Sequence, residues 1–250
     1  PLRDEHNKII GYVGSQRDVT QQKELDRLKD LFVSDVSHEL RTPTTNISLY
    51  LELMETATPG KQVEYLAVLK EQTRLLMKLV EDILDLSRLA IGKTRKIEFT
   101  DVELNSLVEQ VITAHRPLAE ASGLTLVFEP APELPPVWGE SNQLARVINN
   151  LVSNAIHYTI HGGVYVNTYI DRGDVCLDVK DSGIGINHDD QGHIFERFYR
   201  GQQVRQTKIH GTGLGLAIVK EIIDLHESEI YVQSEVGKGS TFTMMLPVKP

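Results

Sequence analysis

Cysteine is almost absent from this chain: Cys176 is the only one among 250 residues, so no disulfide can form within one molecule. Such a chain suits a reducing compartment, and we expect it in the cytosol. The sequence has no run of about 18 apolar residues, the length that spans a bilayer, so we expect this fragment to make no membrane contact. It starts at Pro1 without a signal peptide. We therefore expect a piece of a longer protein, whose own membrane anchoring stays open.

Positive charge is also in short supply. Lys and Arg number 26 against 35 Asp and Glu, which gives a net charge of −9, so the charge balance does not favour nucleic acid as a partner. Hydrophobic residues make up 40% and charged residues 24%, the ordinary balance of a soluble globular chain. A chain of this length can form one large domain or two small ones.

The N-terminal segment differs from the rest of the chain. Residues 7–20 alternate apolar and polar side chains around Ile10, Tyr12 and Gly14, which predicts a strand with nothing beside it to pair with. The stretch GYVGSQRDVTQQK resembles the last strand and exit of PAS-type sensor domains. We therefore expect residues 1–20 to be the end of a sensor module that precedes this fragment. The alternative is a disordered extension.

Helical periodicity begins at Gln21, and after a loop at residues 56–62 a second helix follows. The apolar seam of this second helix has two heptad rows: Leu66, Thr73, Val80 and Ser87, and Leu69, Leu76, Ile83 and Ala90. Leu79 and Leu86 widen the seam to the breadth typical of a four-helix bundle. One chain supplies only half of such a bundle. We therefore expect residues 21–92 to form a long antiparallel hairpin that completes the bundle as a homodimer.

The remainder, residues 97–250, mixes the two kinds of pattern. Strands are predicted over 96–100, 124–130, 163–171, 174–181, 229–235 and 240–247, and helices over 103–121, 141–159 and 213–226. Glu140 or Ser141 is placed to cap the second of these helices. Because most strands are joined as hairpins, we expect an α+β sandwich, a mixed sheet with helices on one face.

Three polar residues share one face of the helix predicted over 141–159. Asn150, Asn154 and His157 are spaced by four and three residues in NNLVSNAIHYT. Asn is a poor helix former, and its amide oxygen is a hard, neutral ligand suited to Mg²⁺ that already carries phosphate. The pattern indicates a metal and phosphate site, with an ordinary solvent-facing polar surface as the alternative.

The stretch DSGIGI closes a predicted strand. Gly183 and Gly185 let the backbone approach a ligand closely, and the carboxylate of Asp181 can accept a hydrogen bond from an exocyclic amine such as that of adenine. The alternative is a glycine turn capped by an aspartate.

A second glycine turn, GTGLGL, opens a predicted helix. Gly211, Gly213 and Gly215 would leave backbone N–H groups facing an anion at the helix start. The stretch lacks the strand and spacing of a dinucleotide fold, and it does not match a P-loop.

Between the two glycine turns lies FERFYRGQQVRQTKIH. Phe195, Phe198 and Tyr199 would anchor it, and Arg200 and Lys208 could reach phosphates. A loop of this kind that ends in glycines is typical of a mobile lid, with a solvated surface loop as the alternative.

The order of these motifs resembles that of the sensor histidine kinases of two-component systems. SHELRTP is similar to their H box, NNLVSNAIHYT to the N box, DSGIGI to the first glycine box, FERFYR to the F box, and GTGLGL and GKGSTF to the later glycine boxes. The resemblance covers residues 20–248. It implies a dimerisation and phosphoacceptor bundle followed by a Bergerat-type ATP-binding domain, in the bacterial cytosol. The partner it implies is the receiver domain of a response regulator.

The resemblance also assigns roles to the H box. His38 would attack the γ-phosphate of ATP, Glu39 would hold the ring and take up its other proton, and Thr42 would orient a water for the reverse, phosphatase reaction. Pro43 deprives the Glu39 carbonyl of its helical partner, which predicts a local kink that exposes His38.

In the nucleotide-binding domain the resemblance implies that Asp181 meets the adenine amine. Asn154 would bind Mg²⁺ and Asn150 would support the phosphates. Tyr158 would contact the nucleotide, and Arg200 the end that carries the γ-phosphate. Phe195 belongs to the F box, and the glycines at 183, 185, 211, 213 and 215 would line the nucleotide.

One position departs from the family pattern: His157 stands where most relatives carry Lys or Arg. A neutral imidazole has no fixed charge near pH 7, which puts the phosphate contact there in doubt. Two other classes of protein are alternatives. An ATPase of the same superfamily that is not a kinase would lack the H box, and a regulatory dimer with a decayed site would lack the intact asparagines, Asp181 and glycines.

Overall fold

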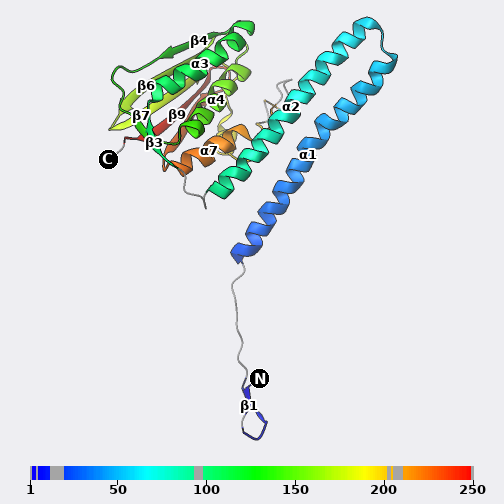
Figure 1. The fold of residues 1–250 in the computed structure, drawn as a ribbon, viewed down its shortest axis with the longest axis vertical. Helices are drawn as coiled ribbons and strands as arrows, with labels where there is room; N and C mark the ends of the chain where they lie inside the picture. Colours follow the sequence, from blue (N-terminus) through cyan, green and yellow to red (C-terminus); the bar gives the residue numbers. More distant parts are fainter. Residues whose placement is uncertain are drawn as a thin grey trace.

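The computed structural model describes residues 2–3, 5–11, 20–92, 98–201, 204 and 211–248, with backbone alone at 2–3, 10–11, 20–31 and 90–92. A long helical hairpin stands beside an α/β part (Figure 1). Within the described residues, none of the helices combines the length and apolarity that crossing a bilayer requires.

The N-terminal segment is a small hairpin rather than a lone strand. Strand β1, Leu2–Arg3, pairs antiparallel with β2, Ile9–Gly11, so the expectation of a strand without a partner was wrong. Asn7 lies in the connecting turn with a φ of 65°, a conformation that Asn tolerates well. Tyr12 and Gly14, the other residues of the predicted strand, lie outside the described part.

Helices α1, Thr20–Thr56, and α2, Pro59–Gly92, form the antiparallel hairpin. Pro59 stands at the first helical position, where a missing N–H costs nothing. Near the loop the helices are joined by an edge-on contact of Tyr50 and Tyr65, with ring centroids 5.4 Å apart. Helix α1 continues through Pro43, which is buried, and the kink expected there stays a prediction.

A five-stranded mixed sheet forms one layer of the α/β part, in the order β4-β6-β7-β9-β8. The strands are β4 Thr125–Glu129, β6 Gly163–Asp171, β7 Asp174–Asp181, β8 Glu229–Glu235 and β9 Gly239–Pro247. Strands β4 and β6 run parallel, and the other neighbours are antiparallel, so the expected mixed sheet is confirmed. A separate pair joins β3, Thr100–Val102, to β5, Val137–Gly139, a strand that was not predicted.

The second layer consists of helices that cover one face of this sheet (Figure 1). They are α3 Leu104–Ala121, α4 Ser141–Tyr158 and α7 Gly215–Leu225, and a short helix α5, His188–Gln191, lies near β8. Glu140 caps α4, because its carboxylate accepts hydrogen bonds from the backbone N–H groups of Asn142, at 3.1 Å, and Gln143, at 2.9 Å. Apolar side chains of all three long helices are buried in one core with those of the sheet.

The heptad seam of α2 is divided between two environments. Leu79 and Leu86 are 2% and 5% exposed, within the core cluster. Leu66 and Val80 are each 44% exposed in the single chain. The apolar surface of the hairpin is therefore only partly covered by its own chain.

Candidate nucleotide site

A pocket opens between α4, the turn after β7, the segment around residue 200 and the glycine turn before α7. Of the residues predicted to bind nucleotide, nine line it: Asn154, His157, Tyr158, Asp181, Gly185, Arg200, Gly211, Gly213 and Gly215. These residues are spread over more than sixty positions of sequence and meet at one end of the sheet. The motifs that the sequence singled out therefore form one site.

Three predicted binding residues, Asn150, Gly183 and Phe195, are not among the described residues that line this pocket. Asn150 is buried one turn before Asn154 on α4, and a side chain at Gly215 would come within 3.3 Å of its Oδ1 atom. Gly183 brings the chain so close to the Tyr158 carbonyl that a Cβ would lie 2.3 Å from that oxygen. Phe195 packs against the hydrophobic core as a partly buried anchor.

Asp181 lies at the end of β7 and is 5% exposed. Its Oδ1 atom accepts hydrogen bonds from the backbone N–H groups of Gly183, at 2.8 Å, and Ser240, at 3.2 Å. Burial raises the pKa of this carboxyl above its ordinary value, while the two backbone hydrogen bonds act to lower it. Oδ2 takes part in neither bond and is the oxygen suited to a ligand. A titratable group perturbed by burial in a cleft is typical of functional sites.

The glycine turn and the segment around Phe198 support each other. Phe198 has a φ of 61° and donates its backbone N–H to the Gly213 carbonyl at 2.9 Å. Gly213 has a φ of 68°, and a Cβ there would lie 2.8 Å from the Phe198 backbone, so only glycine fits. Tyr199 donates its hydroxyl hydrogen to Asp190 at 2.6 Å, which fixes the chain just before Arg200. Lys208, the other predicted phosphate contact, lies outside the described residues.

The phosphoacceptor candidate is not part of this pocket. His38 is exposed on α1 and Glu39 is partly buried beside it, and neither belongs to the described residues that line the pocket. The Thr42 hydroxyl donates a long, 3.5 Å hydrogen bond to the His38 carbonyl, one turn back along the helix. The H-box residues therefore sit together on α1, apart from the nucleotide pocket.

A histidine outside the predicted motifs links the start of α4 to the end of α7. His226 is buried, accepts a hydrogen bond at Nε2 from the Glu140 N–H at 3.0 Å, and donates from Nδ1 to the Ile222 carbonyl at 2.8 Å. Its ring packs against that of Phe99 in a tilted arrangement, with centroids 4.9 Å apart and an angle of 53° between the ring planes. Burial lowers the pKa of His226, because a charged ring could not be solvated there. A single histidine without periodic neighbours gives no sequence signal for this role.

Comparison with known proteins bears on both parts of the chain. Residues 28–92 match a family model described as a His Kinase A (phospho-acceptor) domain, and residues 139–250 match one described as a histidine kinase-, DNA gyrase B- and HSP90-like ATPase. The chain belongs to the sensor histidine kinases. The match over the hairpin distinguishes this chain from the other ATPases described by the second family model, because that model alone covers gyrase- and HSP90-like proteins as well.

Relatives of this sensor histidine kinase extend over nearly its whole length. Drug sensory protein A of Synechocystis is 37% identical over 99% of this chain and 39% of its own length. The sensor histidine kinase WalK of Bacillus subtilis is 36% identical over 99% of this chain and 41% of its own length. The chain thus spans about two fifths of the curated relatives it matches.

Solved structures share the arrangement of elements. The Acinetobacter baumannii histidine kinase AdeS superposes with a TM-score of 0.68, at 25% identity, over 85% of this chain and 98% of its own. The histidine kinase ThkA, solved in complex with the response regulator TrrA, superposes with a TM-score of 0.72 over 92% of this chain and 65% of its own, at 24% identity. These likenesses confirm a helical hairpin followed by a mixed sheet with helices.

Proposed function

We propose that this chain is the kinase core of a two-component sensor, which transfers the γ-phosphoryl group of ATP to His38 and from there to an aspartate in a response regulator's receiver domain. The observation that carries the proposal is the single pocket that gathers nine predicted nucleotide-binding residues. This pocket is joined in one chain to an exposed histidine within a phosphoacceptor-type hairpin.

The lining of the pocket suits a purine nucleotide with its phosphates toward the glycine turn. Oδ2 of Asp181 would accept a hydrogen from the adenine amine, and Tyr158 lies between this region and Gly211. The phosphates would lie toward Arg200 and the N–H groups at the start of α7. Apolar residues such as Ile184 in the same wall would cover the base.

Magnesium fits this site only together with the nucleotide. Among the residues the structure describes, no three His, Cys, Asp or Glu side chains gather into a metal site. Asn154 offers a neutral amide oxygen on the pocket wall, with Asn150 buried one turn behind it. Mg²⁺ is commonly held by few protein ligands and by substrate phosphates, and it neutralises phosphate charge during transfer.

Phosphoryl transfer would take place at the exposed turn of α1. A neutral ring nitrogen of His38 attacks the γ-phosphorus, the new N–P bond forms, and the bond to the oxygen bridging to the β-phosphate breaks as ADP leaves. Glu39 takes up the proton from the other ring nitrogen. Thr42 lies one turn along, and its hydroxyl would orient a water for the reverse, phosphatase reaction. Because His38 does not line the pocket, the α/β part and α1 must approach each other before transfer.

The proposal extends to assembly and organisation. We assign residues 1–20 to the end of a PAS-like sensor module, residues 21–92 to the dimerisation and phosphotransfer hairpin, and residues 97–250 to the ATP-binding domain. The exposed seam residues Leu66 and Val80 favour a homodimer, because a second hairpin would cover them.

Incubation with γ-labelled ATP and Mg²⁺ tests the proposal. We expect protein-bound label that is stable in base and lost in acid, as a phosphoramidate bond requires. Label that survives acid would indicate a hydroxyl ester and contradict a phosphohistidine.

A further inference from the structure

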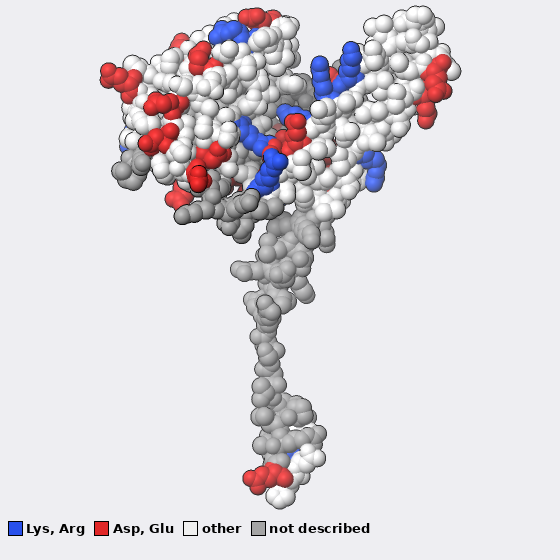
Figure 2. Space-filling view, viewed as in Figure 1, with Lys and Arg blue, Asp and Glu red and all other residues white. Residues whose placement is uncertain are grey.

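One face of α2 carries three charged residues that all meet the α/β part. Lys78, Asp82 and Asp85 follow one another by four and three residues, so their side chains share a face of the helix. Figure 2 shows basic and acidic side chains next to each other where the α/β part meets the hairpin. Helix α2 also packs against α7, which begins at the glycine turn.

Asp82 ties α2 directly to the glycine turn. It is 5% exposed, and its Oδ2 atom accepts a 2.7 Å hydrogen bond from the hydroxyl of Thr212, which is buried between Gly211 and Gly213. The same hydroxyl oxygen accepts a 3.3 Å hydrogen bond from the Leu214 N–H. Burial raises the pKa of the Asp82 carboxyl, and the Thr212 hydrogen bond acts to lower it. A residue of the phosphoacceptor hairpin thus braces the turn expected to hold phosphate.

Asp85 provides a second link one turn further along α2. It forms an ion pair with Arg146 of α4, the helix that carries Asn150 and Asn154. Arg146 is partly desolvated, and this burial lowers its pKa. The two aspartates therefore hold α2 against both the glycine turn and the asparagine helix.

The docking of α2 brings Lys78 to the wall of the nucleotide pocket. It lines the same pocket as Asn154, His157 and Arg200, although it belongs to the helical hairpin and the other described lining residues lie between 153 and 242. It also borders the adjoining cleft that Asn150 lines. Its position therefore lies on the side of the pocket where the asparagines and the glycine turn meet.

The electrostatics of the pocket give this lysine a role. A nucleoside triphosphate brings several negative charges, and His157 supplies no fixed positive charge near neutral pH. Lys78 and Arg200 are fixed cations of the described lining. A lysine ammonium is a usual partner for phosphate, acting as a point charge.

We propose that Lys78 binds the phosphates of the nucleoside triphosphate from outside the ATP-binding domain, so that nucleotide affinity depends on the docking of α2 through Asp82. This inference rests on the proposed ATP site and adds one phosphate-binding residue to it. By linkage, the nucleotide then stabilises the docked arrangement to the same extent that docking stabilises the nucleotide. Movement of the hairpin would change the affinity for ATP without any change in the residues of the pocket's own domain.

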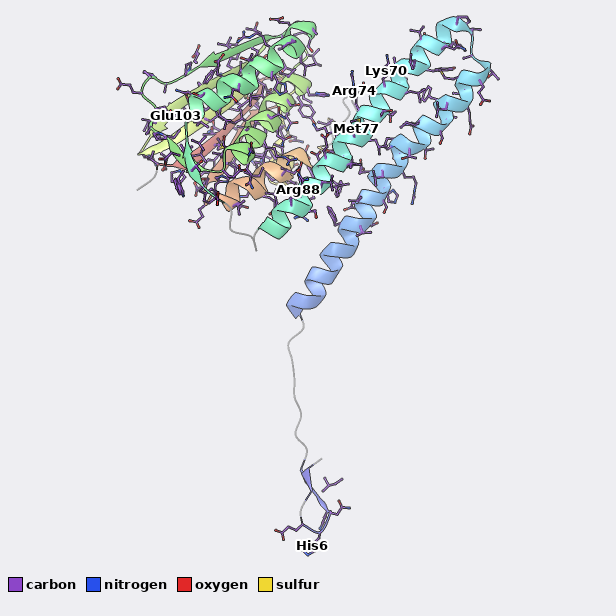
Figure 3. All side chains as sticks on the ribbon, in the orientation of Figure 1. His6, Lys70, Arg74, Met77, Arg88 and Glu103 are labelled. Atoms are coloured by element: carbon purple, nitrogen blue, oxygen red, sulfur yellow. The ribbon has the colours of Figure 1, made fainter. Side chains whose placement is uncertain are left out.

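Calorimetric titration of the full chain with a non-hydrolysable ATP analogue, at fixed free Mg²⁺, tests this. Lys78→Gln should weaken binding about fivefold, the equivalent of about 1 kcal/mol, and Lys78→Arg should restore most of it. The matched control is Lys70→Gln, because Lys70 is exposed on α2 about two turns away and does not line the described pocket (Figure 3). This control should bind like the wild type.

Asp82→Ala examines the dependence on docking. It should weaken binding by a similar factor, and the double variant Lys78→Gln with Asp82→Ala should be no weaker than the more affected single variant. Equal affinity of Lys78→Gln and wild type, or an equal loss in Lys70→Gln, would overturn the phosphate contact. Additive losses would overturn its dependence on Asp82. Failure of the wild type itself to bind the analogue would instead refute the proposed ATP site.

Discussion

Replacement of Asp181 by Asn changes one atom at the base of the nucleotide pocket. The amide oxygen of Asn can still accept the backbone hydrogen bonds of Gly183 and Ser240 that now go to Oδ1. The other oxygen becomes an NH₂ group, which donates hydrogen bonds and cannot accept one. Two donors, this amide and the adenine amine, would then face each other. We therefore expect Asp181→Asn to lose adenine recognition while the turn keeps its shape.

The size of the loss follows from the charge of the lost acceptor. A hydrogen bond to a charged group contributes about 1.5–3 kcal/mol, which corresponds to roughly ten- to a hundredfold in the dissociation constant. Asp181 is 5% exposed, so water cannot readily take the place of the missing partner. The upper part of this range applies if the amide and the amine are forced together.

The stability of the variant should change in the opposite sense. Burial raises the pKa of Asp181 above 3.8, so folding favours its protonated form. The stabilisation from that form is present below pH 3.8 and is lost as the pH rises through the folded-state pKa. At pH 7 a neutral Asn removes the cost of the buried charge. The melting temperature of Asp181→Asn at pH 7 should therefore equal or exceed that of the wild type.

Calorimetric titration with the ATP analogue and a thermal melt of the same samples measure both effects. The control is Asp178→Asn on the same strand, because Asp178 accepts hydrogen bonds from Tyr169 and Thr243 and does not line the described pocket. It should bind nucleotide like the wild type. An unchanged dissociation constant for Asp181→Asn would refute adenine recognition by this residue, and a large fall in its melting temperature would show that the residue is structural.

Three further results are expected. Wild-type affinity for the ATP analogue should rise as the pH falls from about 8 to about 6, because a protonated His157 would attract the phosphates. His157→Lys should flatten this slope and tighten binding at pH 8. Identical slopes for the two proteins at fixed free Mg²⁺ would exclude a contact between His157 and the phosphates. Below pH 6.5 the free energy of unfolding should fall as the pH falls, because burial lowers the pKa of His226 and the unfolded chain then binds the proton more readily than the folded one. His226→Gln should reduce this pH dependence, and the control His161→Gln should keep it. Light scattering at micromolar concentration should give a dimer for the wild type and a monomer for the double variant Leu66→Asp with Val80→Asp, whereas a monomeric wild type would refute the dimer.

Much of the fold was predictable because its elements are long and periodic. The hairpin over 163–171 and 174–181 and the helix over 104–121 follow their sequence patterns almost to the residue. The position of Asp181 at a strand end and the glycine turn before α7 also follow from local sequence, since turn residues mark where an element stops. Local signals therefore located most of the pocket.

Long-range pairing was not predictable from the same signals. Strand β5 has three residues after two prolines, too short for a period to show, and its partner β3 lies more than thirty residues away. The hydrogen bond of Asp82 and Thr212 joins positions separated by 130 residues, and each residue alone resembles ordinary polar surface. His226 likewise bonds to Glu140, 86 residues away, and shows no local sequence signal. Such contacts depend on how whole elements pack together, which no local pattern encodes.

The central claim, that His38 receives the γ-phosphoryl group, is tested most directly by mapping the modified residue. Wild type and His38→Gln are incubated with ATP and Mg²⁺, digested at neutral or mildly basic pH, and analysed by mass spectrometry, with binding of the ATP analogue measured on the same samples. We expect a phosphoryl group on His38 in the wild type, none in His38→Gln, and equal nucleotide affinity, because His38 does not line the described pocket. Phosphorylation that persists in His38→Gln, or that maps to another residue in the wild type, would contradict the account.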